Sequence, residues 1–239
     1  MTVERFALVT GAGRGLGREI AIALADRAAG VAVHYLTDRA AAEATVGSIR
    51  AKGKASIALR ADLIKEREAA GLIARAEREF GRLDILINNV GPILMKPWAE
   101  LNASDWERMF RTNLISSFVC LKAALPGMRT RRWGRIINIG YSRAEQIVAF
   151  PTITAYAAAK TSLLILTRTA AASEAGSGVT INIVSPGLLE GGVLPKGHTI
   201  PDGAVGTFAD VAEAVRYLVS EEARAVTGTN LVVAGSWKM

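Results

Sequence analysis

Phe6-Ala7-Leu8-Val9 is followed directly by Thr10-Gly11-Ala12-Gly13-Arg14-Gly15-Leu16-Gly17, after which a helical pattern begins. The short apolar run predicts a buried strand. The glycines allow a tight turn from strand to helix and a close approach of the backbone to a pyrophosphate, which the positive end of a helix attracts. The common fingerprint Gly-x-Gly-x-x-Gly is not met, because its third position falls on Leu16 or Arg18. The place of this stretch after the first strand still favours a dinucleotide-binding turn.

Short apolar runs alternate with longer helical patterns along the whole chain. Gly30, Gly53 and Gly81 follow helical patterns, where a left-handed residue commonly ends a helix. Thr207 with Asp210 three residues later predicts a capped helix start. Repeated alternation of strands and helices implies parallel pairing through right-handed crossovers. We therefore predict an α/β fold: one Rossmann-type doubly wound domain over residues 1–239, with a parallel sheet of about seven strands and helices on both faces. The expected strands are 6–9, 31–33, 56–59, 85–87, 136–139, 179–184 and 231–233.

The composition narrows the class of protein. Hydrophobic residues make up 50% of the chain and charged residues 21%, which excludes disorder. No apolar run approaches the roughly 20 residues that a membrane span needs, and the N-terminus lacks the plan of a signal peptide. Cys120 is the only cysteine, so no disulfide framework is possible and a cytoplasmic location is expected.

The net charge of +7 raises the question of an anionic partner. The basic residues are spread along the chain and form no single arm, so we expect no nucleic-acid partner. His34 and His198 have no partners at metal-ligand spacing, and no metal is expected. The densest basic group surrounds Trp133, and either a solvated helix end, which we favour, or a docking patch for an anionic substrate or carrier would explain it. Its members are Arg129, Arg131, Arg132 and Arg135.

Tyr156 and Lys160 open a long helical pattern, four residues apart. Residues at this spacing share a helix face, so the phenol and the ammonium can converge on one site. A free tyrosine has a pKa near 10, and a nearby cation favours the phenolate and lowers that value towards the range useful for acid–base chemistry. The pair is thus a candidate for proton transfer.

Taken together and in this order, the motifs resemble the short-chain dehydrogenase/reductase family. The resemblance covers the chain from Arg5 to Trp237 and is closest to the 3-oxoacyl-carrier-protein reductases within that family. It is carried by Thr10-Gly11-x-x-x-Gly15-x-Gly17, Asn88-Asn89-Val90-Gly91, Asn113, Tyr156-x-x-x-Lys160 and Pro186-Gly187.

The resemblance implies roles for these residues. Tyr156 would donate a proton to the substrate carbonyl oxygen, Lys160 would bind the nicotinamide ribose and lower the pKa of the tyrosine, and Asn113 would anchor a water in the proton relay. The remaining cofactor contacts would come from loops at the strand ends. These are Gly11, Arg14, Gly15, Leu16 and Gly17 for the pyrophosphate, Ala61-Asp62-Leu63 for the adenine, Asn89-Val90-Gly91 for the middle of the cofactor, and Pro186, Gly187 and Leu189 for the nicotinamide.

The catalytic serine is the most serious departure from the family pattern. Arg143 stands thirteen residues before Tyr156, where the family generally has that serine. Counting forward from the strand places Tyr141 there instead, with Ser142 one residue further. We favour Ser142 as the second hydrogen-bond donor, since a loop readily absorbs an inserted residue, and keep Tyr141 as the alternative. A second departure is a substrate lid near residues 188–203 that is shorter than usual, which predicts an open site.

The second strand indicates the choice of cofactor. An acid at its end would select NAD by bonding to the ribose hydroxyls, but Tyr35 occupies that end. Asp38 comes three residues later and is expected to cap the next helix. Arg14 and Arg39 can meet a 2′-phosphate with charge-assisted hydrogen bonds, so we predict NADP.

These features predict an NADP-dependent enzyme that reduces a ketone to a secondary alcohol, with a 3-oxoacyl thioester as one candidate substrate. A reductase of pterin-like or other cyclic substrates is the alternative within the enzyme class. A dinucleotide-binding member of the family without turnover is the alternative outside it, motivated by the displaced serine. The family resemblance also implies a homotetramer.

Overall fold

A computed structural model describes residues 4–190 and 205–235 of the chain. Its strands form one parallel sheet in the order β3-β2-β1-β4-β5-β6-β7. The seven expected strands and the doubly wound fold are therefore confirmed. The strands are β1 Phe6–Val9, β2 Gly30–Tyr35, β3 Ala55–Arg60, β4 Ile85–Asn88, β5 Gly134–Ile139, β6 Val179–Pro186 and β7 Asn230–Val233.

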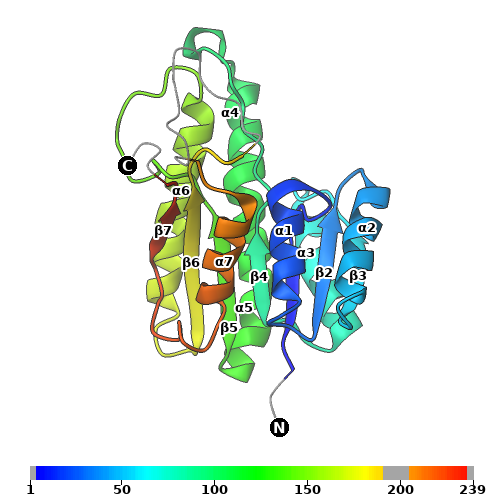
Figure 1. Ribbon diagram of the computed structural model, residues 1–239. Helices are drawn as coiled ribbons and strands as arrows, with labels where there is room; N and C mark the ends of the chain where they lie inside the picture. The colour runs from blue at the N-terminus through cyan, green and yellow to red at the C-terminus, as the bar shows by residue number, and fades with distance from the viewer. Residues whose placement is uncertain (1–3, 191–204, 236–239) are drawn as a thin grey trace.

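Helices cover both faces of the sheet (Figure 1). Buried residues of α1, α2 and α7 pack on one face, and those of α3, α5 and α6 pack on the other. A 3₁₀ turn at Trp98–Glu100 precedes α4, and a π-helical turn at Arg111–Ile115 joins α4 to α5. The α-helices are α1 Gly15–Leu24, α2 Arg39–Arg50, α3 Glu66–Phe80, α4 Ala103–Phe110, α5 Ser116–Arg131, α6 Thr154–Ser173 and α7 Phe208–Leu218.

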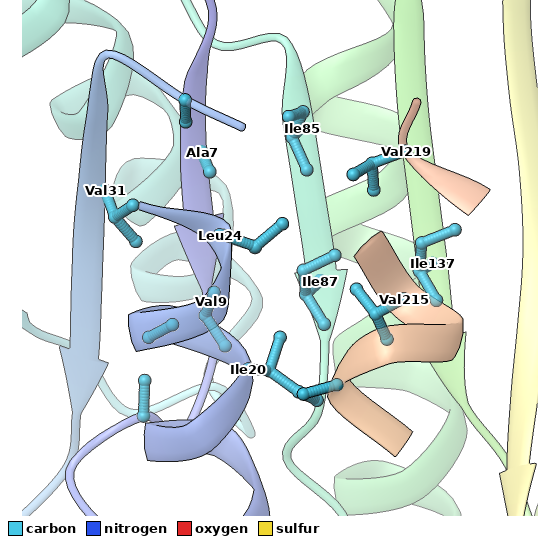
Figure 2. Close-up of a cluster of buried hydrophobic side chains, with 14 of the residues drawn as sticks. Ala7, Val9, Ile20, Leu24, Val31, Ile85, Ile87, Ile137, Val215 and Val219 are labelled. Carbon is cyan, nitrogen blue, oxygen red and sulfur yellow. The ribbon is translucent and has the colours of Figure 1, made fainter. Parts of the chain in front are cut away.

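The strand sequences explain why both faces are covered. Successive side chains of a strand point to opposite faces. In β1, Ala7 and Val9 enter one apolar cluster, whereas Leu8 enters the other. Figure 2 shows the first cluster, in which Ile20 and Leu24 of α1 and Val215 of α7 point towards strands β1, β4 and β5. A central parallel strand of this kind must be apolar on both sides.

The predicted helix boundaries are confirmed at two places and wrong at one. Thr207 and Asp210 form a complete capping box at the start of α7, and Gly81 caps α3 in the left-handed conformation with φ 76°. Gly53 also has a positive φ, two residues after the C-cap of α2. Gly30 is not a helix cap: it is the first residue of β2, paired with Phe6 and Ala55. Its small size matters there, because a Cβ would lie 3.0 Å from both side chains.

The basic group around Trp133 is only partly solvated, and it lies at the amino end of β5, away from the carboxyl ends of the strands. Arg129 pairs with buried Glu174, and Arg131 pairs with buried Asp84. Arg135 is itself buried, with its guanidinium 4.3 Å from the ring centroid of Trp133. The favoured interpretation as a solvated helix end holds for Arg129 and Arg132, which are exposed at the end of α5. It does not hold for Arg135, which is buried and stacks on an indole. Their use as a docking patch is also disfavoured. The group lies where α5 ends and β5 begins, which is the opposite edge of the sheet from the carboxyl ends of the strands, where ligands usually bind.

Three further expectations concern the single cysteine, membrane spans and the substrate lid. Cys120 is fully buried in α5, and burial raises the pKa of its thiol to about 12, which fits a packing role. Over residues 4–190 and 205–235, no helix is both long and apolar enough to cross a bilayer. Residues 191–203 of the expected lid lie outside the described part of the chain. Of its remainder, Leu189 forms a parallel bridge with Gly206.

Candidate active site

A cavity of about 560 Å³ opens at the carboxyl ends of the central strands. The end of β5 contributes Ile139 and the following Gly140, and the end of β6 contributes Pro186 and the following Gly187. In doubly wound folds this edge of the sheet is the usual ligand site, because the loops from both helix layers meet there. Ile93 and Met95 give the cavity an apolar wall.

Tyr156 and Lys160 enter this cavity together from the first turns of α6. Their spacing of four residues places the ammonium of Lys160 5.8 Å from the ring centroid of Tyr156. Lys160 is only 2% exposed and donates a hydrogen bond of 2.7 Å to the carbonyl oxygen of Ile139. The last residue of β5 therefore holds the lysine in position. The expected convergence of phenol and ammonium is present.

The expected lowering of the tyrosine pKa is not found. Burial, with a smaller contribution from Tyr141, raises the pKa of Tyr156 above its usual value. Burial also lowers the pKa of Lys160 to about 7. Both shifts have the same cause, since an apolar surrounding disfavours the charged form of either group. Tyr156 is consequently a protonated phenol at neutral pH, which is the state that a proton donor requires.

Asn113 lies beside this pair because of the π-helical turn between α4 and α5. Such a turn inserts one residue into a helix and is frequent at functional sites. The side-chain amide of fully buried Asn113 donates to the carbonyl oxygens of Pro92, at 3.2 Å, and Met109, at 3.1 Å. Its Oδ1 has no hydrogen-bond partner among the described residues.

Gly91 leaves space in front of this orphaned oxygen. A Cβ at Gly91 would lie 2.6 Å from Oδ1 of Asn113 and 2.7 Å from Nζ of Lys160. The two polar atoms therefore converge on the same small volume, which only a glycine keeps free. A buried acceptor of this kind is a natural position for an ordered water.

The segment after β5 presents three residues that bear on the missing serine. Tyr141 lines the cavity, with its ring centroid 5.7 Å from that of Tyr156 in an edge-on arrangement. Arg143 also lines the cavity. Ser142 does not: its amide donates to the carbonyl oxygen of Pro186 at 3.0 Å, and its hydroxyl is buried without a partner in the described structure. The chain turns at residues 142–145, and this turn places Tyr141 and Arg143, but not Ser142, in the cavity lining.

The glycine-rich turn is held by a network of hydrogen bonds to the end of β4. The amide of Asn89 donates to the carbonyl oxygens of Thr10, at 2.9 Å, and Gly11, at 3.2 Å. The hydroxyl of Thr10 accepts from the backbone N–H groups of Asn89, at 2.8 Å, and Val90, at 3.1 Å. Gly17 packs against this network so closely that a Cβ would lie 2.5 Å from the amide nitrogen of Asn89. The network therefore fixes the turn that follows β1 against the residues that follow β4.

His34 takes part in the same network, which sequence reasoning missed. Its Nδ1 accepts a hydrogen bond of 2.9 Å from the backbone N–H of Gly11, and its Nε2 lies 3.1 Å from the carbonyl oxygen of Ala61. These partners require the neutral tautomer with the proton on Nε2. Burial lowers the pKa of His34 to about 4, so the ring stays neutral. The signal in the sequence was a polar residue within a strand of otherwise apolar residues.

The end of β2 lies at the same edge. Asp38 caps α2 by accepting from the backbone N–H of Ala41 at 2.9 Å, as expected. Tyr35 is the last residue of β2. Arg14 is the exposed N-cap residue of α1, and Arg39 is the first residue of α2, with an ion pair of 3.6 Å to Glu43. No acid therefore ends β2, while two arginines start the flanking helices.

The remaining predicted cofactor contacts are spread around this edge. Asp62 and Leu63 follow β3, and the side chain of Leu63 is largely buried in the core. Leu16 and Leu189 line the cavity itself. Gly15 has φ 54° and nothing within 4 Å of its Cβ position, which leaves the start of α1 open to a ligand. Together with the rigid turn, this open helix start fits the pyrophosphate of a dinucleotide.

Comparison with known proteins shows which family and fold this chain shares. The family model described as enoyl-(acyl carrier protein) reductase matches residues 11–236. A 3-oxoacyl-[acyl-carrier-protein] reductase of Staphylococcus aureus is 34% identical over the full length of both chains. The crystal structure of an acetoin dehydrogenase from Enterobacter cloacae superposes with a TM-score of 0.90, at 28% identity over 98% of this chain and 96% of the other. A blue fluorescent protein from a metagenomic library, in complex with NADPH, has a TM-score of 0.88, at 32% identity over 98% of each chain.

Proposed function

The chain belongs to the short-chain dehydrogenase/reductase family, and on that premise we propose that it reduces a ketone to a secondary alcohol with NADPH. The observation that carries the proposal is the pair Tyr156 and Lys160 inside the cavity at the carboxyl ends of β5 and β6. A buried, protonated phenol there suits the reduction direction, because the developing alkoxide of the substrate must receive a proton.

The cofactor fits the residues of this chain. The turn from Gly11 to Gly17 would hold the pyrophosphate, Asn89 and Gly91 the middle of the molecule, and Lys160 the nicotinamide ribose. Pro186, Gly187 and Leu189 would border the nicotinamide. When bound, the dinucleotide supplies the hydride.

The side chains around the carbonyl would then act in a defined order. Tyr156 donates a hydrogen bond to the carbonyl oxygen and transfers its proton to that oxygen as the alkoxide forms. Lys160 returns a proton towards the phenolate, and a water on Oδ1 of Asn113 connects the lysine to solvent. This use of Asn113 explains why its buried oxygen has no partner within the described chain.

A second donor beside Tyr156 would stabilise the alkoxide, and two hydroxyls were considered for it. The role predicted for Ser142 stays a prediction. The cavity now favours Tyr141, because its ring borders both the cavity and Tyr156, whereas Ser142 lies outside the lining.

The preference for NADPH rests on the end of β2. Asp38 is engaged as a helix cap and is not free to bind a ribose hydroxyl. Arg14 and Arg39 are exposed at the starts of the flanking helices, where a 2′-phosphate would lie. The NADPH named for one structural relative agrees with this choice.

The preference is testable by fluorescence titration of both cofactors. We expect NADPH to bind at least about tenfold more tightly than NADH, a difference of about 1.4 kcal/mol. Replacing Arg14 and Arg39 together with Gln should remove most of the difference and leave NADH binding unchanged. Equal affinities in the unmodified protein would contradict the assignment.

The family relatives favour a 3-oxoacyl thioester as substrate, because the reductase named above acts on 3-oxoacyl groups of a carrier. The acetoin dehydrogenase suggests small hydroxyketones as a second class. Assays should follow NADPH consumption with the N-acetylcysteamine thioester of 3-oxobutanoate, with acetoin and diacetyl, and with a pterin as the cyclic alternative. Absence of turnover with all of them would favour the dinucleotide-binding role without catalysis. The homotetramer and the cytoplasmic location remain proposals from the family.

A further inference from the structure

The cavity contains a cation that the proposed reaction does not use. Its lining includes two charged side chains, Lys160 and Arg143, and no carboxylate among the described residues. Lys160 is held by the carbonyl oxygen of Ile139 and is assigned to the cofactor. Arg143 is therefore the cation left to face a substrate.

Arg143 is positioned by neutral partners. Its Nε donates to the side-chain oxygen of Gln146 at 2.5 Å, and its guanidinium carbon lies 5.0 Å from the ring centroid of Phe150. Within residues 4–190 and 205–235 it forms no ion pair, whereas its neighbour Glu145 is paired with Arg168. Arg143 also acts on the phenol of Tyr141, which is a neutral group, so its positive charge is not cancelled by any of these partners. An arginine with such partners is well prepared to bind an anion.

The rings of the cavity wall separate this arginine from the reacting centre. The ring of Phe150 lies 6.0 Å from that of Tyr141, which in turn lies 5.7 Å from that of Tyr156. Tyr141 contacts both Arg143 and Tyr156, so a substrate with its anion on Arg143 and its carbonyl on Tyr156 would pass the Tyr141 phenol, and we expect a spacer between the two groups. Ile93, Met95 and Ala149 provide an apolar lining for such a spacer.

We infer that Arg143 is a specificity-determining residue that binds an anionic group of the substrate, and that the preferred substrates are ketones with a carboxylate or similar anion on a short apolar spacer. The inference rests on the proposed ketone reduction for its kinetic consequences. The absence of a carboxylate from the described lining strengthens it, because nothing there neutralises the positive potential.

The test compares 5-oxohexanoate with its methyl ester, which differ in charge but share the ketone and the spacer. With NADPH, we expect Arg143→Gln to lower kcat/KM for the acid by about tenfold to a hundredfold, the range of a hydrogen bond to a charged group. The ester should change by less than about twofold, and Arg143→Lys should keep part of the preference for the acid. Pyruvate, whose carboxylate adjoins the ketone, should not show the effect.

Arg78→Gln is the matched control, because Arg78 is an exposed arginine on α3 that does not line the cavity. It removes the same unit charge and should leave both substrates unchanged. Equal losses for acid and ester in Arg143→Gln, or no loss for either, would overturn the inference.

Binding of hexanoate by calorimetry in the presence of NADPH separates this inference from the proposed reaction. If no ketone is reduced, the proposed function fails, and hexanoate still tests Arg143. Binding that is about tenfold weaker in Arg143→Gln would support an anion site. Unaltered binding in the variant, or no binding to the unmodified protein, would overturn it.

Discussion

The two sides of the cavity are built in different ways. On the side of β1 and β4, the turn from Thr10 to Gly17 is held by hydrogen bonds between side chains and backbone atoms. The side chains are those of Thr10, His34, Thr45 and Asn89. On the side of β5 and β6, the segment from Tyr141 to Phe150 combines backbone hydrogen bonds, such as that from Ser142 to Pro186, with edge-on contacts between rings and a guanidinium that lines the cavity.

This difference shows how the molecule separates two tasks. A pyrophosphate is the same in every dinucleotide, so it is suited to backbone N–H groups in a rigid turn. A substrate varies, and side chains on an irregular segment can be exchanged without disturbing the sheet. We therefore expect substitutions on the first side to change cofactor affinity and substitutions on the second side to change turnover.

The sharpest separation of the two sides is expected from Tyr156→Phe. The proton of the phenol is needed only as the alkoxide forms, so kcat should fall by about 10²–10⁴-fold. Affinity for NADPH should stay nearly the same, because the ring and Lys160 remain. Stopped-flow turnover and fluorescence titration would measure the two quantities. Retention of most of the activity would remove Tyr156 from its assigned role.

A smaller effect is expected from Tyr141→Phe, with Ser142→Ala as its matched partner. If Tyr141 is the second donor to the alkoxide, its loss should lower kcat/KM by about 10²–10³-fold. Ser142→Ala should be close to neutral for kcat/KM, because its hydroxyl lies outside the cavity lining. The reverse pattern would assign the role to Ser142, and near-normal rates in both would leave Tyr156 as the only donor.

Gly17→Ala should distort the glycine-rich turn on the β1 and β4 side of the cavity. The added Cβ would collide with the carbonyl of Gly11 and the amide of Asn89, so the turn must move. Overpacking of this kind costs about 1–3 kcal/mol, and we expect NADPH affinity to fall by roughly tenfold to a hundredfold. Gly47→Ala is the control: it lies in α2 with nothing within 4 Å of its Cβ position and should not weaken binding. Unchanged cofactor affinity in Gly17→Ala would contradict this account of the turn.

The last prediction concerns the titration of His34 and stability, not cofactor affinity or turnover. Its pKa is about 4 in the folded protein and near 6.5 in the unfolded chain, so between these values only the unfolded chain binds the proton. The free energy of unfolding should therefore fall as the pH is lowered from 6.5 to 4, with a contribution of at most about 1.4 kcal/mol per pH unit. His34→Gln should show a shallower fall, measured by urea unfolding at several pH values. Parallel curves for the two proteins would show that His34 is not buried in neutral form.

Sequence patterns were sufficient for the sheet and for much of the site. The seven strands are short apolar runs between helical patterns, and β-strands buried on both faces leave that signature. Tyr156 and Lys160 could be placed together because the helical repeat determines which residues share a face. Asp38 could be recognised as a helix cap by its position alone.

Other features depend on the environment and could not be predicted from the residues. The pKa shift of Tyr156 was expected in the wrong direction, because burial outweighs the nearby lysine. The pairing of Arg129 with buried Glu174 and of Arg131 with buried Asp84 could not be predicted, because these partners are distant in the sequence. The choice between Tyr141 and Ser142 required the course of the chain after β5, which spacing does not determine.

The π-helical turn at Arg111–Ile115 also constrains how many residues can join α4 to α5. Because each residue of an α-helix turns it by about 100°, one extra residue sets the faces of α4 and α5 out of phase. Deleting a residue there would restore a regular helix and rotate α4 relative to α5, carrying Asn113 away from Gly91 and Lys160. The number of residues in this turn therefore matters for the site more than the identity of those that face away from it.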